Sequence, residues 1–228
     1  GMEALKTNTT AIGNTAVGYS AASANTTGTN NTAVGRDSLL TATTASDNVA
    51  VGREAMKRAT TGYSNTGIGT EALKETTTGA NNVAVGNDAL LSNTTASSNT
   101  AVGYQAAYSN TTGATNTALG QWSLYDNTSG SNNVAIGRDA LQNNTTAVRN
   151  TAVGYQAGYS VATGSYNVLI GDEAGKDLTV YSSTFVGSAA GENVTSGYGN
   201  SLFGRKAANK LTSGITNVIM GYYAGDDL

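Results

Sequence analysis

The sequence has no cysteine, no histidine and no proline. Disulfide bonds, thiolate or imidazole metal sites and the commonest general base are therefore excluded. Charged residues make up only 12% of the chain and the net charge is −3, so no basic surface for a phosphate backbone is expected. We expect no nucleic-acid partner, no cofactor and no bound metal.

Long apolar segments are also missing. No run approaches the roughly 20 apolar residues that span a bilayer, and no charged-then-apolar signal segment opens the chain. We expect no membrane insertion of this segment. The acidic residues stand at repeat positions, whereas a polysaccharide-acting enzyme needs carboxylates that converge on a groove, so we expect no enzymatic activity.

Glycine recurs every 17 residues, with one interval of 16. Fixed self-similarity of this length predicts stacked units, each of which buries its apolar face against its neighbours. We expect a single repeat array over residues 1–228, a parallel β-solenoid (β-roll) of about 13 turns at about 4.8 Å per turn. Each turn is called a rung here, and its repeating residue the rung glycine. The rung glycines are Gly1, Gly18, Gly35, Gly52, Gly69, Gly86, Gly103, Gly120, Gly137, Gly154, Gly171, Gly187, Gly204 and Gly221.

The residues before each rung glycine predict a strand. The residue directly before it is always apolar, and the residue three before it is Thr, Val or Ser, a β-branched composition typical of strands. We interpret the first of these positions as a core column. Clusters of the Asn-Thr-Thr-Gly type predict the turns between strands. The core column is Val17, Val34, Val51, Ile68, Val85, Val102, Leu119, Ile136, Val153, Ile170, Val186, Phe203 and Met220.

An asparagine column lies four residues before the rung glycine, with Ser183 in the shortened rung. In-register parallel stacking would place these amides about 4.8 Å apart, where each can hydrogen-bond the next. We therefore predict a structural asparagine ladder. Its members are Asn14, Asn31, Asn48, Asn65, Asn82, Asn99, Asn116, Asn133, Asn150, Asn167, Asn200 and Asn217.

The middle strand residue, two before the rung glycine, is apolar as well. Alternate strand residues point to opposite faces, so both faces are expected to be dry and a second chain to cover one of them. In rungs whose middle strand residue is Ala, the residue four after the rung glycine is mostly large. In rungs whose middle strand residue is Leu, Phe or Ile, the residue four after the rung glycine is Gly or Ala. This exchange predicts contact between the two columns and a change in packing near residue 158.

Two adjacent threonine columns allow two interpretations. A flat threonine array could bind ice, but adjacent residues face opposite ways and a two-wide lattice needs Thr-x-Thr. We favour hydroxyls that satisfy the turn backbone. The columns are Thr9, Thr26, Thr43, Thr60, Thr77, Thr94, Thr111, Thr128 and Thr145, and beside them Thr10, Thr27, Thr44, Thr61, Thr78, Thr95, Thr112, Ser129 and Thr146.

An acidic column lies two residues after the rung glycine, with arginines one position earlier. Like charges on neighbouring rungs repel, so arginines of a neighbouring chain or a cation such as calcium would have to offset them. The simpler interpretation is solvated surface charge paired with arginine, and we assign no metal. The residues are Asp37, Glu54, Glu71 and Asp88, with Arg36 and Arg53.

Aromatic residues on adjacent rungs form the candidate binding site. Tyr104, Tyr108, Trp122 and Tyr125 could stack on sugar rings, or could instead cover a seam between subunits.

Asn-x-Ser/Thr sequons are a separate feature, expected to accept glycans on the outer turn only in a eukaryotic secretory route. These sequons begin at Asn8, Asn25, Asn30, Asn93, Asn110, Asn127, Asn143, Asn144 and Asn193.

The repeated strings Asn-Thr-Ala-Val-Gly (14–18, 31–35, 99–103, 150–154), Asn-Val-Ala-Val-Gly (48–52, 82–86) and Asn-Val-Ala-Ile-Gly (133–137) resemble the head repeats of YadA-like trimeric autotransporter adhesins. The Gly-Tyr-Gln-Ala strings at 103–106 and 154–157 resemble repeats of phage and viral tail fibres. The resemblance implies a left-handed β-roll in which three chains wind side by side, at the cell surface or on a virion. The repeat is longer here than in adhesin heads.

Together these features lead us to expect a structural or adhesive shaft or head segment of a homotrimeric extracellular fibre, an adhesin or a tail fibre. Its partners would be two further copies of itself and a host surface receptor or glycan. The pattern already runs at residue 1 and restarts at Gly221, so we expect an excerpt of a longer fibre protein. The alternative is a self-assembling extracellular filament that stacks end to end, and an ice-binding β-solenoid is favoured less.

Overall fold

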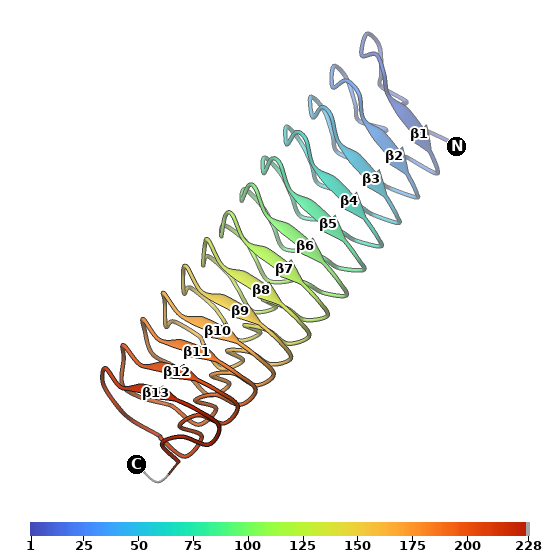
Figure 1. The fold of residues 1–228 in the computed structure, drawn as a ribbon. Helices are drawn as coiled ribbons and strands as arrows, with labels where there is room; N and C mark the ends of the chain where they lie inside the picture. Colours follow the sequence, from blue (N-terminus) through green and yellow to red (C-terminus); the bar gives the residue numbers. More distant parts are fainter. Residues whose placement is uncertain (227–228) are drawn as a thin grey trace. The chain divides into compact units, whose positions relative to one another are not determined.

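The computed structural model describes residues 1–226. Within that range the secondary structure consists of thirteen three-residue strands, β1–β13, and contains no helix. The chain divides into two compact units, Gly1–Thr115 and Asn116–Leu228. In Figure 1 the first unit runs from blue to green and the second from green to red.

The first unit contains six strands, and each pairs in parallel with the next along the chain (Figure 1). Paired residues are one full repeat apart, as in Thr15↔Thr32 and Val49↔Thr66, so every rung repeats the register of the previous one. The strands are β1 (Thr15–Val17), β2 (Thr32–Val34), β3 (Val49–Val51), β4 (Thr66–Ile68), β5 (Val83–Val85) and β6 (Thr100–Val102).

The second unit contains seven strands paired in the same way. The shortened rung keeps the register, because Val168 pairs with Thr184, and the missing residue is therefore lost from the loop between them. Both units are parallel β-solenoids of 17-residue repeats, which confirms the predicted fold class. The strands are β7 (Thr117–Leu119), β8 (Val134–Ile136), β9 (Thr151–Val153), β10 (Val168–Ile170), β11 (Thr184–Val186), β12 (Ser201–Phe203) and β13 (Val218–Met220).

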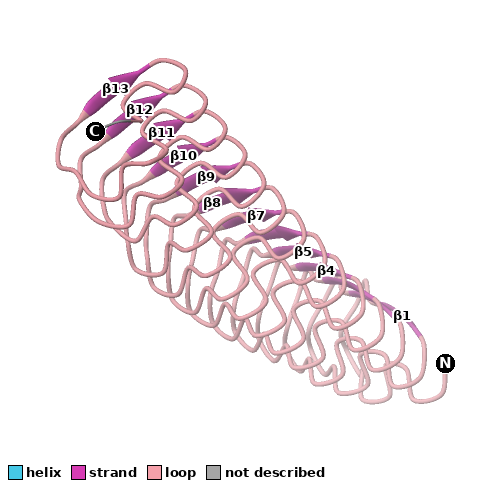
Figure 2. Ribbon diagram, turned by 90° about the horizontal axis from the view of Figure 1, so that it is seen from below, coloured by secondary structure: helices cyan, strands magenta, loops and turns pink. Residues whose placement is uncertain are grey.

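Hydrogen bonds between rungs continue in the loops, which are drawn in pink in Figure 2. Leu39 N donates to Ala55 O over 3.1 Å, and Met56 N donates to Ala72 O over 2.9 Å. Backbone pairing between turns is therefore not confined to the strands. The loops adopt this path with positive φ angles at non-glycine residues, such as 57° at Glu54 and 51° at Met56.

The rung glycine ends each strand because no other residue fits there. Gly52 has φ +139°, a conformation that side-chain-bearing residues rarely adopt. A Cβ at Gly52 would also collide with the carbonyl oxygen of Gly69 in the next rung. The 17-residue recurrence of glycine thus marks a position where the backbones of successive rungs approach closely.

The interior of each unit is formed by two columns that touch. The inner strand column is the middle residue of every strand, and it is buried in all strands from β2 to β13. The turn column, four residues after the rung glycine, packs against it: a Cβ at Gly67 would lie 3.0 Å from Met56 Cγ, and one at Gly158 would lie 2.6 Å from Leu169 Cδ1. The predicted contact between these columns is confirmed, and from Gly158 onward the large side chain comes from the strand instead of the turn.

The prediction of a core column directly before the rung glycine is wrong. Ile68 is 40% exposed and Leu119 is 43% exposed, and none of the residues in that column is buried. The middle strand residue occupies the interior, so its two neighbours in the strand must point outward. Periodicity identified the strand correctly but assigned the wrong face to the interior.

Candidate functional site

The outward side of the strands forms an uncharged surface that we call the outer sheet face. It consists of the first and third residue of every strand, which are Thr, Val, Ile, Leu, Phe or Met apart from one Ser. In the first unit Ile68 and Val83 are 40% and 37% exposed, and in the second Ile170 is 39% exposed. Within each unit an exposed or half-exposed apolar residue, the third of every strand, therefore recurs on each rung of this side, and a recurring apolar surface of this kind is typical of an interaction site.

The asparagine ladder predicted from the sequence is present within each unit. Asn82 Nδ2 donates to Asn65 Oδ1 (3.0 Å) and to Ala96 O (2.9 Å), and Asn82 N also donates to Asn65 Oδ1 (2.9 Å). In the shortened rung Ser183 N donates to Asn167 Oδ1. Asn82 is fully buried and its hydrogen-bonding groups are used inside the coil, so the ladder holds rungs together and offers nothing to an external ligand.

A second, interrupted asparagine column lies seven residues after the rung glycine, and the sequence analysis did not identify it. Asn25 Nδ2 donates to Asn8 Oδ1, and Asn110 Nδ2 donates to Asn93 Oδ1. These residues begin sequons that were expected on the outer turn, but Asn25, Asn93 and Asn110 are buried. A glycan could not be accommodated at these three positions in the folded chain.

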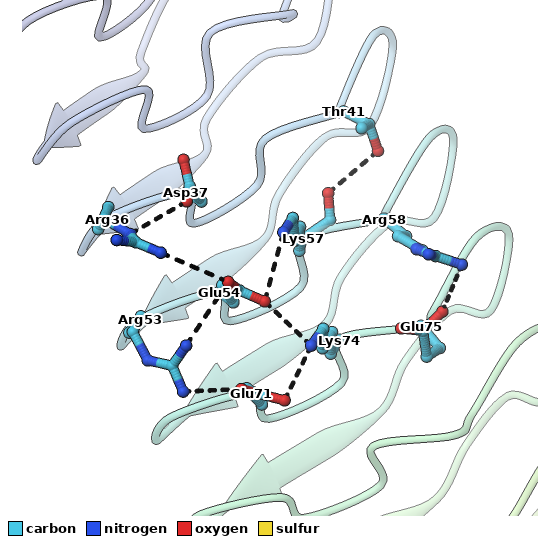
Figure 3. Close-up of polar contacts among 10 residues, drawn as sticks. All are labelled: Arg36, Asp37, Thr41, Arg53, Glu54, Lys57, Arg58, Glu71, Lys74 and Glu75. Carbon is cyan, nitrogen blue, oxygen red and sulfur yellow. Dashed lines mark hydrogen bonds and ion pairs between the residues drawn. The ribbon is translucent and has the colours of Figure 1, made fainter.

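Three members of the acidic column, Asp37, Glu54 and Glu71, are paired with arginine and lysine within the chain (Figure 3). Arg53 Nη2 lies 2.7 Å from Glu71 Oε1, and Lys74 Nζ lies 3.0 Å from Glu54 Oε2 and 2.9 Å from Glu71 Oε2. Lys57 Nζ adds a pair with Glu54 at 3.3 Å. The favoured interpretation, charge paired with arginine, holds for Asp37, Glu54 and Glu71, and the sequence analysis missed the lysines three residues after the carboxylates, which add to it.

These ion pairs shift the pKa values of Glu54, Glu71 and Lys74. The hydrogen bond from Lys74 lowers the pKa of Glu54 against the opposing effect of burial, and the same donor lowers the pKa of Glu71. The hydrogen bonds to Glu71 and Glu54 raise the pKa of Lys74. All three groups are thus held in their charged forms.

The candidate aromatic residues are divided between the two units. Tyr104, which is 45% exposed, and Tyr108 belong to the first unit, whereas Trp122 and Tyr125 belong to the second. Whether they contact carbohydrate stays a prediction. The structure adds a neighbour to one of them, since the guanidinium carbon of Arg138 lies 5.7 Å from the centroid of the Trp122 ring.

Arg138 also lies 5.5 Å from the centroid of the Tyr155 ring, which is 40% exposed. Trp122, Arg138 and Tyr155 come from three successive rungs of the second unit. The sequence analysis missed Arg138 because it grouped aromatic residues only, and it missed Tyr155 because it grouped aromatic residues of adjacent rungs only. Their common place, directly after a rung glycine, was the available signal.

The first threonine column is occupied with backbone hydrogen bonds. Thr26 Oγ1 donates to Thr43 O over 2.9 Å, Thr60 Oγ1 to Thr77 O over 3.1 Å, and Thr145 Oγ1 to Ala162 O over 3.1 Å. This matches the favoured interpretation that hydroxyls satisfy the turn. The second column is exposed along its whole length but is only one residue wide.

Residues 1–226 contain neither a metal-binding cluster nor a membrane-spanning helix. No three His, Cys, Asp or Glu side chains gather there in a way that could hold a metal ion. No helix in that range is long and apolar enough to cross a membrane.

No protein-family model, no curated protein and no solved structure matches the chain. The outer sheet face and the Trp122–Arg138–Tyr155 group are therefore the features from which a function can be inferred.

Proposed function

We propose that the chain is a structural and adhesive segment of an extracellular fibre in which parallel copies associate through their outer sheet faces. The observation that supports this proposal is the outer sheet face itself, which presents an apolar residue at the third strand position of every rung and carries no charge. Residues such as Ile68 and Ile170 still expose about two fifths of their surface. Covering each would contribute on the order of 1 kcal/mol.

A second copy of the chain fits this face better than an unrelated partner does. The apolar side chains recur once per rung, and only a surface with the same rise can match them along a unit. Another copy of the chain has the same rise per rung because it has the same repeat. A charged partner is disfavoured because the first and third strand positions contain no Lys, Arg, Asp or Glu.

The number of copies and the setting come from the resemblance to adhesin heads and tail fibres. On that basis we propose three copies, a left-handed coil, a place at the cell surface or on a virion, and attachment to a host receptor or glycan. We propose no catalysis, since Glu54 and Glu71 of the acidic column are paired with arginine and lysine.

Sedimentation equilibrium of the chain tests the proposal. We expect a trimer, and we expect the double variant Ile68→Lys/Ile170→Lys to become monomeric while its β-sheet circular dichroism is retained. Thr61→Lys, on the exposed threonine column, is the matched control and should leave the trimer intact. A monomeric parent chain would contradict the proposal.

Ice binding is the second candidate, because the outer sheet face has the two-wide spacing that the threonine columns lack. Strands such as β2 and β6 present Thr-x-Val outward. A monomeric chain that produces thermal hysteresis, lost in Ile68→Lys/Ile170→Lys, would favour this function. Fibres of indefinite length in electron micrographs would instead favour the self-assembling filament.

A further inference from the structure

We propose that Trp122, Arg138 and Tyr155 of the second unit bind an acidic saccharide, a sugar ring that carries a carboxylate or a sulfate. The proposal deepens the adhesive function proposed above by naming a ligand class. It requires only the fold of the second unit, so it can be tested whether or not the copies associate.

The Arg138 side chain is held in place at one end and free at the other. Its Nε lies 3.2 Å from Asp139 Oδ2, and the side chain of Asp139 is only 4% exposed while that of Arg138 is 56% exposed. The rings of Trp122 and Tyr155 lie within 6 Å of the guanidinium carbon. Within residues 1–226, Nε is the only Arg138 side-chain nitrogen in an ion pair, the two terminal nitrogens make no hydrogen bond, and more than half of the side chain is exposed.

Comparison with the same position in the first unit shows why Arg138 is available. The residue 18 positions after Arg53 is Glu71, and that after Arg36 is Glu54; both carboxylates pair with the arginine of the preceding rung, at 2.7 Å and 3.8 Å. The equivalent residue for Arg138 is Gln156. An uncharged amide therefore stands where the first unit places the competing carboxylate.

The chemistry of this group fits an acidic sugar. A guanidinium with two free amino groups matches the two oxygens of a carboxylate or sulfate in a bidentate pair. An exposed aromatic ring can stack against the C–H face of a pyranose, and Tyr155 offers such a ring beside the guanidinium. A polyanion such as nucleic acid needs several cations, whereas a single sugar acid needs one.

Trp122 is the only tryptophan of the chain, so its fluorescence reports on this site directly. Oligogalacturonate and heparin fragments are titrated into the full chain as the carboxylate and sulfate probes, with neutral maltooligosaccharides as the reference. We expect a saturable change in emission with at least one acidic probe and none with the neutral one, and we expect the affinity to fall with added salt.

Variants are compared by isothermal titration calorimetry with the acidic probe that binds. Arg138→Gln should weaken binding at least about tenfold. Gln156→Glu should do the same by restoring the competing carboxylate, while Arg53→Gln, the matched control, should have no effect. Absence of binding by both acidic probes, equal binding of the neutral probe, or unchanged affinity in Gln156→Glu would overturn the proposal. Sedimentation of the same samples reports separately on association.

Discussion

Leu169 occupies the space into which a side chain at Gly158 would project: a Cβ there would lie 2.6 Å from Leu169 Cδ1. One rung earlier the arrangement is reversed, with Leu141 in the turn column and Ala152 in the strand. The two positions share one volume of the interior. Gly158 has φ +61° and Leu141 has φ +49°, so leucine can adopt the backbone conformation at Gly158.

This exchange predicts strong coupling between the two sites. Gly158→Leu alone overpacks the interior and should destabilise the chain by roughly 1–3 kcal/mol, and Leu169→Ala alone leaves a cavity that should cost about 2–5 kcal/mol. The double variant recreates the arrangement of the preceding rung and should recover much of both losses. Urea denaturation of the parent, the two single variants and the double variant gives the coupling energy between the two sites. If the two losses of stability simply add in the double variant, the two side chains do not share one volume.

The asparagine ladder predicts a loss of stability that depends on the side chain substituted. Asn82→Ala removes the acceptor of the Asn99 backbone N–H and the donors to Asn65 and Ala96. Because these groups are buried, we expect a loss on the order of 3 kcal/mol. Asn82→Ser, which follows the natural Ser183, should cost less. Asn87→Ala, at an exposed position, is the control and should be nearly neutral in thermal denaturation.

The features predicted correctly from the sequence are those that recur at the same position of many repeats. Glycine recurs on every rung, asparagine on every rung but the shortened one, and the sizes of the two interior columns vary together, so their register and contacts follow from stacking alone. The inward face of the strand does not follow, because both of its faces are apolar and a period of two cannot rank them. The exposed Ile68 therefore was assigned to the core.

Contacts between different positions of the repeat were missed for a related reason. Lys74 reaches Glu71 and Glu54 from a loop in which Glu71 and Leu73 have φ 58° and 54°. No sequence rule favours positive φ at leucine or glutamate, so the direction of these side chains could not be derived. The Arg138–Trp122 contact likewise joins different positions of neighbouring rungs.

The interrupted asparagine column predicts a stabilising pair of substitutions. Asn25 Oδ1 is buried without a hydrogen-bond partner. In this column the next rung supplies the donor, as Asn25 Nδ2 does for Asn8 Oδ1, but the next rung has Ala42. Ala42→Asn should provide that donor and bond to Ala45 O, as Asn93 bonds to Ala96 O.

The Oδ1 of the new amide would itself face Ala59 in the following rung, so Ala42→Asn alone should change stability little. Ala59→Asn in addition continues the column to the hydroxyl of Thr76, and we expect Ala42→Asn/Ala59→Asn to raise the free energy of unfolding by roughly 0.5–1.5 kcal/mol, measured by urea denaturation. Ala42→Leu is the control that fills space without donating, and it should not stabilise. A less stable Ala42→Asn would mean that the interior has no room for the amide.

The Glu54–Lys74–Glu71 ion pairs predict acid sensitivity of the first unit. The hydrogen bond from Lys74 holds the pKa of Glu54 below its ordinary value of 4.5, so the unfolded chain takes up the proton first. The stabilisation is therefore present above that value and is lost as the pH falls through the lower pKa of the folded state. The thermal midpoint of the parent chain should decline as the pH falls below 4.5.

Glu54→Gln isolates this contribution, because other carboxylates also titrate in acid. The variant should be less stable than the parent at neutral pH, and the difference should vanish once the parent carboxylate is protonated. Glu75→Gln, which removes the carboxylate paired with Arg58 at a more exposed site, is the matched control and should produce a smaller difference. A difference between parent and Glu54→Gln that does not change with pH would show that the variant acts through packing instead of charge.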